Sequence, residues 1–138
     1  MSLRDDLAGV LARDSRYSIH AYAFVFESLE YTKNRKRKAQ LRTRARGRGN
    51  DQSRHVSPRE LCEGARDLAL RNYGLLALTV LSQWGIRSTS DLGEIVFNLI
   101  ASGDLEKTPT DSRVDFDNVF DFETALRRDY IVALDDVA

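Results

Sequence analysis

Cysteine and histidine are scarce in this chain of 138 residues, which contains one cysteine and two histidines. A single cysteine, Cys62, excludes an intramolecular disulfide framework and the usual multi-cysteine zinc site. His20 and His55 lack a second histidine four residues away, so neither has the spacing of a helical metal site. We therefore predict no metal and no cofactor, and we interpret Cys62 as a small core residue.

Long hydrophobic runs are also absent. The longest run covers residues 75–81, and Thr79 interrupts it. A bilayer-spanning helix needs about 20 apolar residues, so this run is far too short. Charged residues at positions 4–6 occupy the place where a secretory signal needs an unbroken apolar stretch. We expect a cytoplasmic protein without a membrane partner.

Acidic residues are missing from one segment, although the formal net charge of the chain is zero. Nine basic residues and no acid lie between Tyr31 and Asp51. The chain has 21 residues of each charge, so the rest of the sequence contains 12 basic and 21 acidic residues. The basic residues are Lys33, Arg35, Lys36, Arg37, Lys38, Arg42, Arg44, Arg46 and Arg48.

The basic segment has three interpretations. Arginine and lysine pair with phosphate oxygens, and the release of counterions favours nucleic-acid binding. However, residues 33–48 contain no aromatic side chain on which a base could stack. The alternatives are a solvated, flexible loop at about 44–54 or an arm that docks on an acidic protein surface.

The spacing of apolar residues predicts a mainly α fold, a single domain over residues 1–138 with five or six helices. The best start signal combines Ser57 as N-cap, Pro58 and the capping-box partner Glu60. A small C-terminal β-hairpin from residues 105–107 and 114–116 would complete a winged-helix-like arrangement. The predicted helices cover about residues 2–12, 18–41, 57–73, 75–84, 88 or 90 to 102, and 121–132.

The stretch from Leu78 to Leu105 has the layout of a helix-turn-helix. Its second helix, residues 90–102, contains no lysine or arginine. Since phosphate neutralisation dominates affinity for DNA, we predict that this helix does not read DNA. The layout indicates ordinary packing of three helices.

Aromatic residues crowd the second predicted helix, where Tyr22, Phe24 and Tyr31 extend beyond one helical face. Aromatics left exposed in this way would mark contact with a partner, either another protein or a second copy of this chain. The alternative is that the C-terminal tail packs across the helix and buries them.

Five blocks of the chain, from Tyr22 onward, resemble an uncharacterised family of small bacterial proteins of about this length. The resemblance implies a single domain and no particular activity, cofactor or catalytic residue. The blocks read AYAFVFESLEYT, RHVSPRELCEGARDLAL, YGLLALTVLSQWGI, DLGEIVFNLI and DLEKTPTDSRVDFDNVFDF.

Three functional hypotheses follow. The favoured one is a non-enzymatic protein-interaction module, as a homo-oligomer or with another protein. The alternative is a nucleic-acid-associated protein that binds RNA or DNA through residues 33–48. The third is an enzyme whose site is assembled from scattered residues such as Glu94, Asp111 and Arg113.

Overall fold

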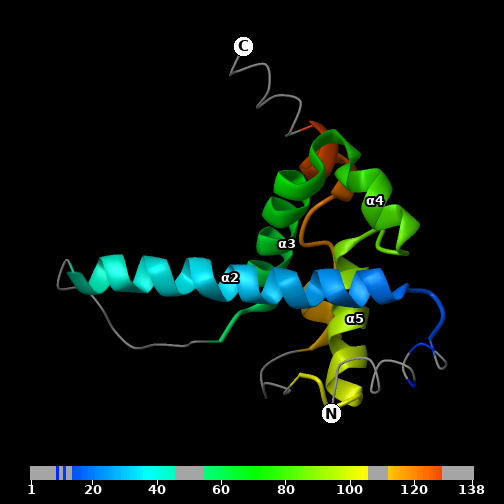
Figure 1. Ribbon diagram of the computed structural model, residues 1–138, viewed down its shortest axis with the longest axis horizontal. Coiled ribbons are helices and arrows are strands. Elements are labelled where there is room, and N and C mark those ends of the chain that lie inside the picture. Colours follow the sequence, from blue (N-terminus) through cyan, green and yellow to red (C-terminus); the bar gives the residue numbers. More distant parts are fainter. Residues whose placement is uncertain (1–8, 10, 12–13, 46–54, 106–111, 129–138) are drawn as a thin grey trace.

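The fold is described from a computed structural model of the chain (Figure 1), which describes residues 9, 11, 14–45, 55–105 and 112–128. Within these residues the chain forms four α-helices and three short helical turns. The α-helices are α2 (Ile19–Ala45), α3 (Pro58–Tyr73), α4 (Ala77–Gln83) and α5 (Thr89–Ala101). The turns are η1 (Gly74–Leu76), η2 (Arg113–Phe116) and the π-helical η3 (Thr124–Arg128).

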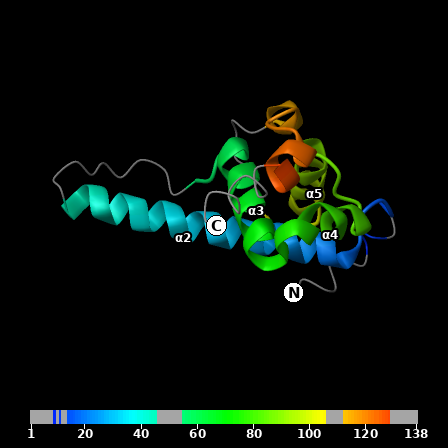
Figure 2. The same ribbon diagram turned by 90° about the horizontal axis from the view of Figure 1, so that it is seen from above.

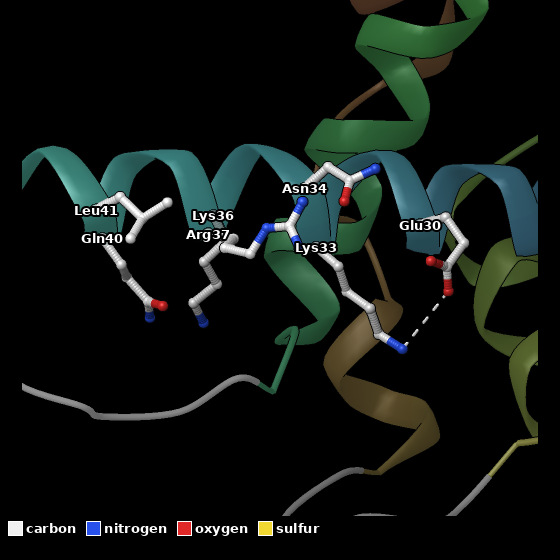
Figure 3. A pocket seen from close by; sticks show the side chains of 7 residues that line it. All are labelled: Glu30, Lys33, Asn34, Lys36, Arg37, Gln40 and Leu41. Atoms are coloured by element: carbon white, nitrogen blue, oxygen red, sulfur yellow. Dashed lines mark ion pairs between the residues drawn. The ribbon is translucent and has the colours of Figure 1, made fainter.

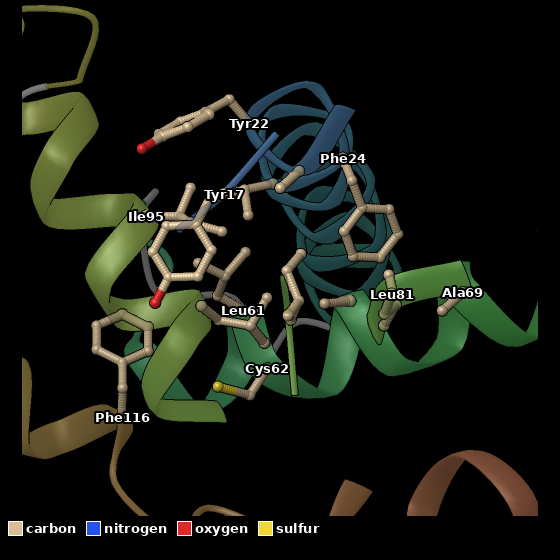
Figure 4. Close-up of a cluster of buried hydrophobic side chains, with 14 of the residues drawn as sticks. Tyr17, Tyr22, Phe24, Leu61, Cys62, Ala69, Leu81, Ile95 and Phe116 are labelled. Carbon is tan, nitrogen blue, oxygen red and sulfur yellow. The ribbon is translucent and has the colours of Figure 1, made fainter. Parts of the chain in front are cut away.

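Helix α2 is the longest element, with 27 residues, and α3 and α5 pack against it. Its C-terminal half extends beyond α3, α4 and α5 (Figures 1 and 2). The core lies where α2, α3 and α5 meet, and η2 covers it from the side (Figure 4). Its fully buried side chains include Tyr22, Leu81, Leu92, Ile95 and Leu99.

The N-terminus of α3 forms as its sequence predicts. The Ser57 hydroxyl accepts a hydrogen bond from the Glu60 N–H at 3.1 Å, and the Glu60 carboxylate accepts one from the Ser57 N–H at 3.0 Å. This reciprocal pair satisfies two backbone donors that the helix itself leaves open. The prediction of a capping box with Pro58 at the start of the helix is confirmed.

Helices α2 and α3 approach each other closely at Gly64, which faces Thr32. A Cβ atom at Gly64 would lie 1.9 Å from Thr32 Oγ1. Thr32 is buried, and its hydroxyl donates to the Ser28 carbonyl one turn earlier at 2.7 Å. The absent side chain at Gly64 therefore lets the two backbones come together, and this contact orients α2 on the body.

Helix α5 holds the segment that follows it. Ser88 caps α5, since its hydroxyl accepts from the Asp91 N–H, and this decides between the two predicted caps. Gly93 lies under Phe116, where an added Cβ would stand 2.6 Å from the ring. Thr89 Oγ1 accepts from the Val119 N–H at 3.2 Å. These contacts fix η2 against α5.

The predicted fold class is wrong in the number of helices and in the hairpin. Four α-helices occur among the described residues, and none of those residues forms a strand. Residues 113–116 form a 3₁₀ turn because Ser112 and Asp115 make a capping box, in which the Ser112 N–H donates to Asp115 at 3.0 Å. Most of the first predicted helix, residues 106–107 of the other predicted strand and residues 129–132 of the last predicted helix lie outside the described residues. The described part of that last helix contains the π-helical turn η3.

The fourth predicted helix also differs from the structure. Its first turn is the 3₁₀ turn η1, and α4 proper has only 7 residues. Leu75 and Leu76 are 51% and 64% exposed, so this element is not the central, fully buried helix that its composition indicates.

Candidate functional site

The C-terminal half of α2, Lys33–Ala45, is named here the basic arm. Its lysines, arginines, glutamine, leucine and alanines are strong helix formers, and its cations lie toward the C-terminal, negative end of the helix dipole. Seven of the nine basic residues that the sequence offers for nucleic-acid binding lie on α2, and Arg44 is in its last turn. Arg46 and Arg48 lie outside the described residues, as does most of the loop predicted at 44–54.

Two cations of the arm attach α2 to α3. Arg35 pairs with Asp67, and Lys36 pairs with Glu60 at 3.0 Å. Lys36 also donates to the His55 carbonyl at 2.5 Å. Partial burial alone would raise the pKa of Glu60, but hydrogen bonds from the Ser57 backbone and from Lys36 outweigh it and lower that pKa. These contacts hold the start of the arm on the body.

Three other cations of the arm point into solvent. Arg37, Lys38 and Arg42 are exposed, and none of them has an ion pair or hydrogen bond with the part of the chain that the structure describes. Lys33 is exposed too, and its pair with Glu30 is long, at 3.7 Å. Exposed pairs of this kind contribute little and exchange readily. The arm therefore offers four cations to an anionic ligand.

One face of the arm borders an open depression of about 530 Å³ (Figure 3). Its lining side chains are mostly polar, and they come from three successive turns of α2. The surface is consequently suited to an anion in contact with water rather than to an apolar ligand. The lining residues are Glu30, Lys33, Asn34, Lys36, Arg37, Gln40 and Leu41.

A second polar cluster, not predicted as a unit, lies at the opposite end of α2. Arg16 pairs with Asp14 at 2.7 Å and with Glu94 at 3.3 Å, and Arg113 also pairs with Glu94. The Asn98 amide donates to Asp14 at 3.0 Å. The side-chain hydrogen bond from Arg16 holds the pKa of Asp14 well below its usual range.

Asp14 and Glu94 each face an arginine, and the pKa of Asp14 is lowered, whereas a general acid needs a raised pKa. The structure thus joins Glu94 and Arg113, as the enzyme hypothesis requires, but as an ion pair that ties η2 to α5. The third residue of that hypothesis, Asp111, lies outside the described residues. Sequence spacing gave no signal for this cluster, because Asp14 and Asn98 are 84 positions apart.

The aromatic residues predicted for partner contact are divided between core and surface. Tyr22 is 0% exposed and Phe24 is 2% exposed, so neither offers its ring to a partner in this conformation. Tyr31 is half-buried and lies beside Arg35 and Arg71, whose guanidinium carbons are 5.4 and 5.7 Å from its ring centroid. Tyr22 lies against α5, where its hydroxyl accepts from the Asn98 amide at 3.0 Å, and Phe24 lies against Trp84 at the end of α4, with ring centroids 6.0 Å apart.

The surroundings of Cys62 and His20 indicate structural roles for these two residues. Burial raises the pKa of the Cys62 thiol to about 12, so the nucleophilic thiolate is disfavoured near neutral pH. His20 stacks on Trp84 with ring centroids 5.8 Å apart. Within the described residues no three acids, histidines or cysteines gather as metal ligands.

No family model, curated protein or solved structure matches this chain. The family resemblance of the five sequence blocks therefore stays a prediction. Among the described helices none combines the length and the apolar character that a membrane crossing requires.

Proposed function

We propose that this protein binds nucleic acid through the phosphate contacts of the basic arm. One observation carries the proposal: Arg37, Lys38 and Arg42 are exposed on a helix that projects from the body, without an ionic partner among the described residues. An anion that binds them displaces counterions and breaks no ion pair within the part of the chain that the structure describes. Counterion release is the main source of sequence-independent affinity for nucleic acids.

The favoured alternative from the sequence, a protein-interaction module, loses its main support with the burial of Tyr22 and Phe24. An acidic protein surface would still match the charge of the arm. However, in its described residues the arm presents one large exposed apolar side chain, Leu41 at 55% exposure. Protein interfaces are depleted in lysine and are anchored by buried aromatic residues, so this surface is better matched to phosphates.

The test is fluorescence anisotropy with labelled DNA and RNA, single-stranded and duplex, at salt concentrations from about 50 to about 200 mM. The variant Arg37→Ala/Lys38→Ala/Arg42→Ala removes three phosphate contacts. We expect the slope of log affinity against log salt to become shallower by about 2.7. Alanine is the best helix former, so far-UV circular dichroism should show an intact helix.

The matched control removes the same charge from the body of the protein. Arg59, Arg87 and Arg127 are exposed on α3, on the turn before α5 and on η3. Their replacement by alanine should leave the salt slope within about half a unit of the parent value. If the salt slope becomes equally shallow in both triple variants, binding depends on the net charge of the protein and not on the basic arm. If the protein binds poly-glutamate but none of the nucleic acids, the proposal is wrong and the arm binds an acidic protein partner instead.

A further inference from the structure

We infer that the nucleic acid is a B-form DNA duplex and that the exposed face of the basic arm lies in its major groove. The inference rests on the proposed function and deepens it. Its basis is the arrangement of the exposed side chains in two cationic rows with an uncharged strip between them.

The two rows follow from helical geometry. With about 100° per residue, Lys33 and Arg37 lie within about 40° of each other on one flank of the arm. Lys38 and Arg42 lie within about 40° of each other on the other flank. Asn34 and Leu41 fall between the two rows, and all six side chains are exposed.

The opposite face of α2 is occupied by α3. Thr32 is buried against Gly64, and Arg35 and Lys36 are paired with carboxylates of α3. At the start of the arm α3 therefore covers the face opposite to the two rows, and the rows themselves stay open to a ligand. The arm projects clear of the other helices there (Figure 2).

The dimensions of the arm suit the major groove of B-DNA. A helix with its side chains is about 10–12 Å across, and that groove is about 12 Å wide with a phosphate backbone on each side. One cationic row would contact each strand, while Asn34 and Leu41 face the base edges. An asparagine amide matches adenine and an apolar side chain matches the thymine methyl group.

Other nucleic acids fit the arm less well. Single strands are bound through aromatic side chains that stack on bases, and the arm has none. The major groove of A-form RNA is too deep and narrow for side chains to read. Glu27 and Glu30 are exposed on the same side of α2 nearer the body, so they repel phosphates and confine the contact to the arm.

The experiment compares one sequence as DNA duplex, RNA duplex and single-stranded DNA, each about 20 nucleotides long, against the full chain. We expect the DNA duplex to bind at least about tenfold more tightly than the other two. Methyl green, which occupies the major groove, should displace the protein, and netropsin, which occupies the minor groove, should not.

Two double variants test whether both rows make contact. Lys33→Ala/Arg37→Ala and Lys38→Ala/Arg42→Ala should each make the salt slope shallower by about 1.8. Three outcomes would overturn the inference. Only one of the double variants could change the salt slope, the three probes could bind with equal affinity, or netropsin could displace the protein where methyl green does not. Each of these outcomes includes nucleic-acid binding, so the proposed function would stand. Absence of binding to every probe would overturn both.

Discussion

The contact between Gly64 and Thr32 allows a quantitative test of how α2 sits on α3. Replacement of Gly64 by alanine adds a Cβ atom that would lie 1.9 Å from Thr32 Oγ1 and 3.1 Å from Thr32 Cβ. The Thr32 hydroxyl must then rotate away from the Ser28 carbonyl, or the helices must separate. Since the position of α3 decides which face of the arm stays exposed, this contact also underlies the proposed interface.

Two opposing terms determine the effect of Gly64→Ala. Alanine is favoured over glycine inside a helix by about 0.8–1 kcal/mol. Overpacking of a closed contact costs about 1–3 kcal/mol, and a buried hydroxyl left without an acceptor costs a similar amount. We therefore expect the free energy of unfolding to fall by about 1–5 kcal/mol. In a Thr32→Ala background the closest atom is Cβ, at 3.1 Å, so the same substitution should be close to neutral.

Urea unfolding followed by far-UV circular dichroism measures these values in the four proteins of the double-mutant cycle. The control is Asn72→Ala, at an exposed position of the same helix, which should be neutral or slightly stabilising. The expected coupling energy between positions 32 and 64 is at least about 1 kcal/mol. If Gly64→Ala is equally destabilising with threonine or alanine at position 32, the helices do not meet at this point.

Two further predictions concern the core and a helix cap. Because burial raises the pKa of Cys62 to about 12, the native state keeps the thiol protonated while the unfolded chain ionises near pH 8.5. The protonated Cys62 thiol therefore contributes fully to the stability of the native state below about pH 8.5, and this contribution is lost as the pH rises toward 12. Urea titrations should show the parent losing about 1.4 kcal/mol per pH unit more than Cys62→Ala above about pH 9, and parallel pH profiles would contradict this. Separately, Ser57→Ala removes the cap of α3 and should lower the free energy of unfolding by about 1 kcal/mol, seen as a melting temperature lower by a few degrees. An unchanged melting temperature would show that water replaces the cap.

Local features were predictable where neighbouring residues alone decide the conformation. The capping box at Ser57 and Glu60 forms as expected, and Cys62 is a buried core residue. The apolar face of α5 is buried at Leu92 and Ile95. These signals succeed because helix starts and amphipathic faces depend on residues within one or two turns.

The errors lie where a short segment has two local alternatives. Residues 113–116 have the composition of an edge strand, but Ser112 and Asp115 turn them into a 3₁₀ helix, and Phe116 then packs over Gly93. Residues 75–84 are apolar enough for a buried helix, yet the chain begins them with a 3₁₀ turn that leaves Leu75 exposed. Tertiary packing selected between conformations of similar local preference.

The candidate site combines both kinds of information. The charge excess of residues 33–48 is plain from the sequence, because charge is a property of composition. Only the tertiary structure decides which cations remain available, since Arg35 and Lys36 are paired with α3 while Arg37, Lys38 and Arg42 face solvent. It likewise decides that Tyr22 belongs to the core. Availability depends on which helix packs on which face, and partners distant in the chain determine that packing.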